Sequence, residues 1–372
     1  MSTATQNRRR ASDSSLGSLV ARRPVTSFLV MVYAITWTAF LPVVLQGWGL
    51  LALPVDPSEG IAFNAVVSVA TILGVALPAF LVTGATTGEA GVRDLLSRCL
   101  RWRVGVHWYV VALLGFVGSM VLVASVFQGL APLGALAGKW PLFFAMFLPE
   151  VLLPFAFIQI FEEAGWTGFM QHDLQERRGP VLASVLVAPA FFLMHLPALL
   201  IDSGVGLGLL IVAGALVIAM AFFRVVVMWL YNGTGRSVLI VALFHSAFNS
   251  ATSLGQQRFT AELIPGPSLL HAAGVLVAVA VLVVALTRGR LAYKPERATT
   301  RPPSGPSAAR PTPYAAQTSR RGKETRKWQP PQQHRPAPRR RRKGGPSRSG
   351  TSFLPSRSPG HFGGSPCSRR AA

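Results

Sequence analysis

The sequence predicts an all-α, polytopic membrane helical bundle, and two observations support this fold class. First, 51% of the 372 residues are hydrophobic, only 13% are charged, and the mean hydropathy is +0.43, which is too apolar for a soluble domain of this size. Second, apolar runs long enough to cross a bilayer, ~20 residues each, recur along the chain. The lipid bilayer is therefore the first expected partner.

The apolar runs number about eight. They cover residues 27–47, 61–83, 107–129, 141–161, 180–200, 206–231, 237–254 and 267–287. The seventh run is the shortest. The first run follows Arg22 and Arg23 and is too long for the apolar core of a signal peptide, and no small-residue cleavage pattern follows it, so we expect a retained span.

The charges in the connecting segments predict the orientation. Basic residues collect before run one and after runs two, four, six and eight, whereas each of the other loops has at most one. Because Lys and Arg favour the cytoplasmic side, we expect both termini in the cytoplasm. This pattern indicates a multi-pass protein of the cytoplasmic membrane.

Three segments are expected. Residues 1–24 form a basic flexible leader, residues 25–290 a membrane core, and residues 291–372 a basic, disordered tail rich in Pro, Arg and Ser. Such a tail can bind anionic lipid at ~1 kcal/mol per basic residue, although an extension without a role is an equally weighted alternative. No folded nucleic-acid module is visible, so no specific nucleic acid partner is expected. Cys99, predicted in a cytoplasmic loop, and Cys367 imply no disulfide framework.

Ionisable side chains inside the apolar runs are costly in lipid and are therefore candidates for function. They are Glu150, Glu162, Glu163, His195, Arg224 and His245. Taken singly, each has a structural explanation: a carboxylate at a helix end, a polar contact between helices, or, for Arg224, a side chain that extends to the interface. Glu150, which has no comparable neighbours, is interpreted as an interhelical hydrogen-bonding group. The others together favour a site.

Spacing and topology indicate which side chains meet. Phe191 and His195 are four residues apart, as are His245 and Asn249, so each pair shares a helix face. The Glu pair is expected at the cytoplasmic end of the fourth run, where a break or re-entrant turn at Gly165 and Gly168 would bring it inward.

Two chemistries fit these side chains. A Glu and a His can hold and deprotonate a water molecule, while a His and an Asn donate to an oxygen. Alternatively, Glu162, His195 and His245 could ligate zinc and leave a fourth position for water. The cofactor expectation is therefore open between Zn and a metal-independent site.

Three ordered motifs carry a family resemblance. EEAGWTG (162–168), FFLMHLP (191–197) and GTGRSVLIVALFHSAFN (233–249) resemble the EExxxR, FxxxH and HxxxN motifs of the CPBP family of intramembrane proteases (CAAX protease and bacteriocin-processing, Abi), over about residues 140–255. The resemblance implies a membrane endopeptidase, CAAX-protease-like and proposed to be a metalloprotease, whose site opens toward the cytoplasm and whose substrate is a peptide or membrane protein.

The resemblance also implies roles for residues at the motif positions. Glu162 with His195 would activate water, and His245 with Asn249 would form the oxyanion hole. The second carboxylate of the pair and two aromatic residues would assist: Glu163, Phe191 and Trp166.

One motif position departs from the family pattern, because Thr167 stands where the motif has Arg. Arg224 could supply the charge from another helix. If the missing charge limits the site, replacing Thr167 by Arg is expected to raise proteolysis. The departure keeps open a catalytically impaired membrane binding, scaffold or immunity protein. A proton-coupled transporter is a third hypothesis, disfavoured by the few polar residues in the outer halves of the runs.

Overall fold

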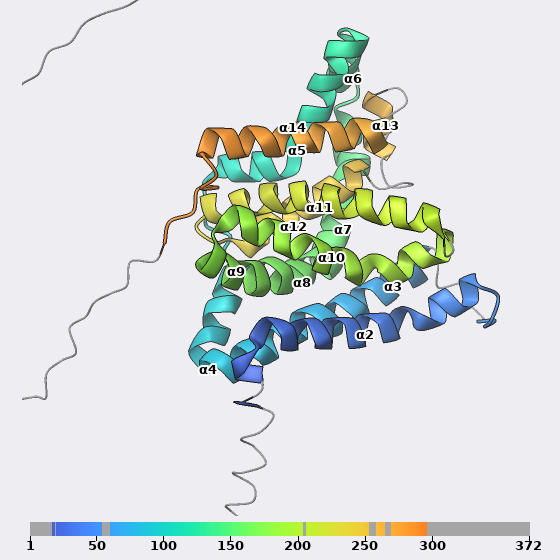
Figure 1. Cartoon of the computed structure of the whole chain (residues 1–372). Helices are drawn as coiled ribbons and strands as arrows, with labels where there is room; N and C mark the ends of the chain where they lie inside the picture. Colours follow the sequence, from blue (N-terminus) through green and yellow to red (C-terminus); the bar gives the residue numbers. More distant parts are fainter. Residues whose placement is uncertain are drawn as a thin grey trace, which may run out of the picture. The chain divides into compact units, whose positions relative to one another are not determined.

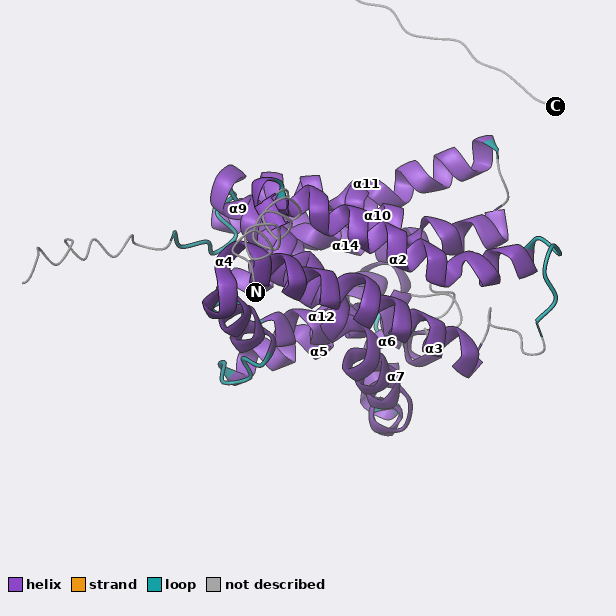
Figure 2. Cartoon of the chain, turned by 90° about the horizontal axis from the view of Figure 1, so that it is seen from below, coloured by secondary structure: helices purple, strands orange, loops and turns teal. Residues whose placement is uncertain are grey.

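The computed structural model describes residues 17–18, 20–53, 60–203, 206–252, 258–264 and 269–295. Helices and short connections make up this described part, and no strand occurs in it (Figure 2). The all-α prediction is confirmed. The predictions for residues 1–16 and for the tail from residue 296, including Cys367, lie outside the described residues.

The helices follow one another with short connections (Figure 1). In chain order they are α2 (Pro24–Gly47), α3 (Gly60–Thr71), η1 (Ile72–Ala76), α4 (Leu77–Cys99), α5 (Val106–Gln128), α6 (Ala131–Gly138), η2 (Phe143–Phe147), α7 (Leu148–Pro154), η3 (Phe155–Gln159), α8 (Ile160–Glu163), η4 (Ala164–Gln171), α9 (His172–Arg178), α10 (Pro180–Ser203), α11 (Leu207–Gly233), α12 (Val238–Thr252), α13 (Arg258–Leu263) and α14 (Leu269–Thr287). The η elements are π-helical turns that join α-helices into longer rods.

Seven helical segments within the described residues are long and apolar enough to cross a membrane, and α12 is a shorter apolar helix. These eight correspond in order to the eight predicted runs, and α12 is the seventh run, the shortest one. The chain is therefore a multi-pass membrane protein.

Two boundaries were predicted wrongly. The second span continues from Gly60 to Cys99, and the fourth from Phe143 to Arg178, because polar residues after an apolar run do not stop a helix whose backbone hydrogen bonds continue. Gly88, with φ of 68° and ψ of −162°, is not helical, so the second segment consists of two helices that meet at a kink a few residues beyond the predicted end of the run. Cys99 consequently lies buried at the end of α4 and not in a loop.

Close packing explains Gly165 in the fourth rod, the helical segment from Phe143 to Arg178. No break occurs at Gly165 or Gly168, because both lie within η4. A Cβ at position 165 would lie 2.5 Å from Val75 Cγ1 and 3.0 Å from the Val75 carbonyl oxygen. Glycine therefore lets this rod pack closely against η1, and the expected re-entrant turn is replaced by a continuous helix with π turns.

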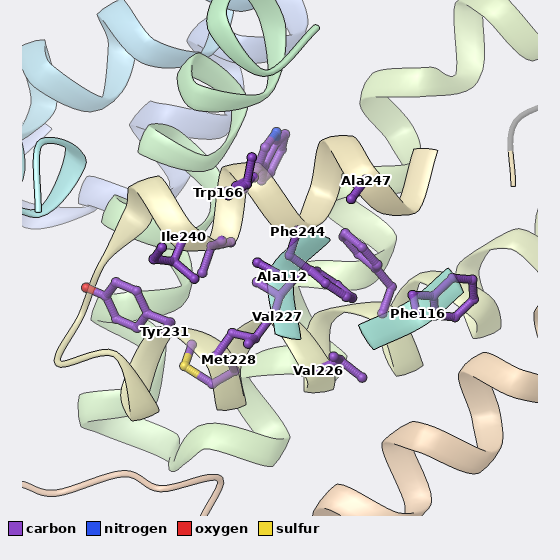
Figure 3. Packing of buried hydrophobic residues seen from close by; sticks show 14 of the residues in the cluster. Ala112, Phe116, Trp166, Val226, Val227, Met228, Tyr231, Ile240, Phe244 and Ala247 are labelled. Atoms are coloured by element: carbon purple, nitrogen blue, oxygen red, sulfur yellow. The ribbon is translucent and has the colours of Figure 1, made fainter. Parts of the chain in front are cut away.

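The core lies where α5, α11 and α12 meet the fourth rod. Figure 3 labels Phe116 of α5, Val227 of α11 and Phe244 of α12 among the residues of this cluster, together with Trp166 of η4. Trp166 and Val227 have no exposed surface. This packing holds α12, which carries the HxxxN motif, and η4, which directly follows the Glu pair at the end of α8, in a fixed relation.

Candidate active site

A cavity of about 260 Å³ lies among α2, α3, η3, α10 and α12. Glu162, His195 and Asn249 line it together, from three different rods. Its volume has room for several water molecules. The structure therefore brings together three of the four side chains to which the resemblance assigned the chemistry.

Glu162 reaches the cavity because it lies in the interior of a rod, sixteen positions before the end of α9. It was predicted at a span end, from which it would have had to be folded inward. It is 4% exposed, although carboxylates are mostly exposed in proteins. The surrounding cavity, and not bulk water, is the environment of this carboxylate.

Glu163 points away from the cavity into a buried cluster. Its Oε2 accepts hydrogen bonds from Arg224 Nη1, at 2.9 Å, and from Thr167 Oγ1, and Arg224 Nη1 also donates to Thr167 Oγ1 at 3.1 Å. The side chains of Glu163 and Arg224 are both 0% exposed. The Glu pair therefore divides into one carboxylate that faces the cavity and one that forms a buried ion pair.

His245 lies directly behind the cavity. Its Nδ1 is 2.8 Å from Glu163 Oε1 and 3.8 Å from Glu162 Oε2. A carboxylate only accepts hydrogen bonds, so Nδ1 carries the proton that is donated to Glu163, and Nε2 is the ring atom left for other partners. Glu163 thus fixes the orientation of the imidazole, with Phe223 packed at 5.0 Å between ring centroids.

His195 is half-buried on α10, and its Nδ1 lies 2.9 Å from the Phe191 carbonyl oxygen. Since the carbonyl accepts, Nδ1 is the donor and the Nε2 lone pair is free to accept a proton. The rings of Phe191 and His195 lie 4.7 Å apart, which confirms that they share a helix face. Phe191 also packs edge-on against the buried Trp166, 5.5 Å away.

Arg224 contacts Thr167, the residue at the position where the family motif has Arg. Its guanidinium carbon lies 4.1 Å from the centroid of the Phe191 ring, a cation–π contact, while its Nη1 binds Glu163. Arg224 therefore brings a positive charge from α11 to Glu163, and the Thr167 hydroxyl is bonded to both side chains. This contact was foreseen as one possibility, and the structure contains it.

Glu162, His195 and His245 are the side chains that could hold zinc. In the described part of the chain, no group of three or more His, Cys, Asp or Glu side chains is arranged to hold a metal ion. Nδ1 of His245 is bonded to Glu163 and Nδ1 of His195 to a carbonyl oxygen, so each ring keeps Nε2 for another partner, as metal-ligating histidines commonly do. The choice between zinc and a metal-independent site therefore stays a prediction.

Sequence reasoning missed several residues of the cavity wall because it searched for ionisable side chains and for the residues that share a helix face or a motif with them. Gln159, Asn64, Ser246 and Ser250 also line it. Gln159 is 5% exposed, and its Oε1 has no hydrogen-bond partner among the described residues. It precedes Glu162 by three positions, the helical spacing that could have revealed it.

Glu150, expected to bond between helices, lies apart from the cluster around Glu163. Its backbone oxygen accepts from Ser250 Oγ at 2.8 Å, while its carboxylate is 3.9 Å from Arg258 Nε. The interhelical bond thus uses the backbone of Glu150.

The protein is thus a polytopic helical membrane protein, and its intramembrane cavity is lined by a carboxylate, an imidazole and an amide. Residues 144–251 match the model of a family described as type II CAAX prenyl endopeptidase Rce1-like. The matched stretch, 108 of the 372 residues, contains all three motifs and is similar to that family, as the motif resemblance predicted. No curated protein gives a significant match to the sequence.

Proposed function

We propose that this protein is an intramembrane endopeptidase of the cytoplasmic membrane that hydrolyses a peptide bond with a water molecule activated by Glu162 and His195. The observation that supports this most strongly is the shared cavity of Glu162, His195 and Asn249. The substrate is a peptide segment or membrane protein. Because the family resemblance implies a site that opens toward the cytoplasm, we expect the scissile bond near the cytoplasmic leaflet.

The nucleophile is produced at the cavity wall. Glu162 accepts a proton from water while His195 holds the same water through its Nε2, so that the water oxygen attacks the carbonyl carbon. The C–N bond then breaks, and the proton passes to the leaving amine. Because Glu162 is almost shielded from bulk water, its interaction with the reacting water is stronger than it would be at a surface.

The developing oxyanion is stabilised from α12. Asn249 offers its amide N–H groups to the cavity, and His245 offers Nε2 when the ring is an imidazolium held by Glu163. Glu163, Thr167 and Arg224 act as positioning residues through His245. Removing one oxyanion donor in other enzymes costs ~3 kcal/mol, or roughly 10²-fold in rate.

The mechanism above uses no metal ion, and a zinc site held by Glu162, His195 and His245 is the alternative to be tested. Metal analysis of the purified protein, with His195→Ala and His245→Ala as controls, distinguishes the two. Cleavage that survives chelation supports the mechanism above. Stoichiometric zinc that is lost in both variants would contradict it.

The function can be tested without knowing the substrate. The wild type and Glu162→Gln are expressed in cells lacking the gene, and new protein N-termini in the membrane fraction are compared. We expect a set of termini that only the wild type produces. Glu89→Gln, an exposed change outside the cavity, is the matched control and should behave as wild type. Identical termini for all three proteins would refute the proposal.

The competing hypotheses lose support from two observations. The impaired scaffold or immunity protein was suggested by the absent motif Arg, and Arg224 now provides that charge. Proton-coupled transport needs a path between the two faces of the membrane. A cavity lined by Asp94, Arg98 and Arg236 opens near the basic loops, yet none of its lining residues also lines the cavity at Glu162.

A further inference from the structure

A basic cavity lies at one end of the helical bundle, separate from the candidate active site. It has a volume of about 660 Å³ and is formed by the end of α4, the start of α5, the end of α11 and the segment that follows α14. The proposed reaction uses none of the residues that line it. We call it the basic cavity because of the side chains in its wall.

The wall of the basic cavity carries an excess of positive charge. Of the described residues that line it, Arg98, Arg101, Arg236 and Lys294 are basic and only Asp94 is acidic. Asp94 Oδ2 lies 2.9 Å from Arg98 Nη2, so these two charges offset each other. Three positive charges remain, and they favour an anionic ligand.

The basic side chains differ in how far they are already bonded. Arg98 is 6% exposed, and its guanidinium donates to groups on two other elements, η4 and α11. Arg101 is exposed, and only its Nη1 is bonded, to the Gly235 carbonyl oxygen at 2.6 Å. Lys294 is exposed and makes no hydrogen bond or ion pair with another described residue. The guanidinium of Arg101 and the ammonium of Lys294 therefore keep N–H groups for an acceptor in the cavity.

Arg236 brings its charge to the cavity from a turn that suits glycine. Its φ is 75°, in the left-handed region that glycine adopts without strain. Its backbone N–H donates to the Tyr231 carbonyl oxygen at 2.7 Å and closes the end of α11. Its guanidinium lies 3.5 Å from the half-exposed carboxylate of Glu176, which does not line the cavity. The turn thus holds a cation at the cavity wall where the backbone geometry alone would favour glycine.

Two tryptophans complete the wall. Trp108 of α5 and Trp229 of α11 line the basic cavity, and their ring centroids lie 5.2 Å apart. Each lies near the end of a helix that is long and apolar enough to cross a membrane. Tryptophan is enriched at the level of the lipid headgroups. The basic cavity therefore lies where the phosphate group of a membrane lipid is expected.

An apolar groove follows the basic cavity along α11. The groove has a volume of about 420 Å³ between α10, α11 and α14, and each of its nine lining residues is Val, Ala or Phe. Helices α11 and α14 are in contact and run side by side (Figure 1). Phe222 and Val225 line the groove and Trp229 the basic cavity, and their spacings of three and four residues place them on one face of α11. A charged hollow and an apolar one are thus separated by about 6 Å of helix.

We propose that the basic cavity binds the phosphate group of an anionic phospholipid, whose acyl chain lies along the apolar groove. Arg101, Arg236 and Lys294 donate to the phosphate oxygens, as charge-assisted hydrogen bonds of this kind are strong. Basic pockets between membrane helices bind such headgroups in other proteins. A free phosphate ion would meet the same cations and would leave the groove unused. Lipid binding here depends neither on catalysis nor on which leaflet contains this end of the helices.

The melting temperature of the full chain in neutral detergent tests the proposal. It is measured alone and with phosphatidylglycerol, phosphatidylcholine or inorganic phosphate. A ligand stabilises a protein only when it binds the folded chain better than the unfolded chain, so non-specific attraction of lipid to basic terminal segments does not contribute. We expect phosphatidylglycerol to raise the melting temperature by roughly 2 °C or more, and the other two additions to leave it unchanged.

Variants locate the effect. In Arg101→Gln/Lys294→Gln the rise caused by phosphatidylglycerol should be lost, and Lys294→Gln alone, which breaks no bond to a described residue, should reduce it. Arg93→Gln/Arg178→Gln removes two exposed charges outside the cavity and is the matched control, in which the rise should persist. Each variant is compared with itself with and without lipid, so a change in its own stability does not affect the result.

Three results would overturn the proposal. No rise in the wild type would mean that the folded chain has no such site. An equal rise in the wild type and in both double variants would mean that the lipid acts through general surface charge. An equal rise with inorganic phosphate would mean that the cavity takes a free anion and that the apolar groove has no part in binding.

Discussion

The buried ion pair between Arg224 and Glu163 gives the sharpest prediction about how the site is held together. Arg224→Met removes the charge, keeps a long apolar side chain, and leaves the Glu163 carboxylate buried with Thr167 and His245 as its remaining partners. Both side chains are fully buried, and breaking such a pair from one side costs about 3–5 kcal/mol, because the remaining charge is uncompensated. The retained bonds of Glu163 place the expected loss near 3 kcal/mol.

The assay is equilibrium unfolding of the purified protein in mixed micelles, which yields a free energy of unfolding for each variant. Arg177→Met is the matched control, because Arg177 pairs with Asp173 at 2.7 Å on an exposed helix face, where such pairs contribute about 0–1 kcal/mol. Glu163→Gln should also destabilise the protein. The double variant Glu163→Gln/Arg224→Met leaves neither charge buried, so its loss should be smaller than the sum of the single losses by about 1–3 kcal/mol.

Additive losses, or an Arg224→Met variant as stable as Arg177→Met, would refute the reasoning. The first result would mean that the two charges do not interact. The second would mean that Arg224 is not buried on Glu163 in the folded protein.

Three further predictions follow from the packing around the site. Gly165→Ala should destabilise the protein by about 1–3 kcal/mol because its Cβ meets a side-chain atom at 2.5 Å, whereas Gly214→Ala on α11, with no atom within 4 Å, should be neutral or stabilising in the same unfolding assay. Thr167→Arg should lower stability and cleavage, since position 167 is fully buried beside Arg224. The double variant Thr167→Arg/Arg224→Met should recover part of both losses. Higher activity of Thr167→Arg alone would contradict the packing of Thr167 against Arg224. Gln159→Leu should leave stability unchanged, because its Oε1 has no partner to lose, and should raise KM; an unchanged KM would show that this amide does not touch the substrate.

Much of this architecture was readable from the sequence. The apolar runs identified every long span because a helix that crosses lipid must be continuously apolar. The spacing of four residues between Phe191 and His195 predicted that the two side chains share a helix face. The contact of Arg224 with Glu163 could be raised only as one option, since periodicity along single helices does not tell which helices are neighbours.

The errors arose where the end of an apolar run was equated with the end of a helix. Polar residues after Phe161 suggested a boundary, yet the helix continues through π turns to Arg178, and Glu162 is thereby placed deep in the bundle without any break. Close packing against Val75 explains Gly165, and such tertiary contacts leave no local signal. Uncharged polar residues such as Gln159 and Asn64 were missed because their cost in lipid is modest and they resemble ordinary helix contacts.

In the proposed mechanism, Glu162 and His195 act on one water molecule. The most direct test measures kcat/KM of the purified protein in liposomes on a peptide identified by the comparison of N-termini, for Glu162→Gln, for His195→Ala and for the double variant. Residues that act as a unit are strongly non-additive, so each single variant should lose roughly 10²-fold or more, and the double should lose no more than the worse single. Either single variant at wild-type activity, or losses that multiply in the double, would contradict it.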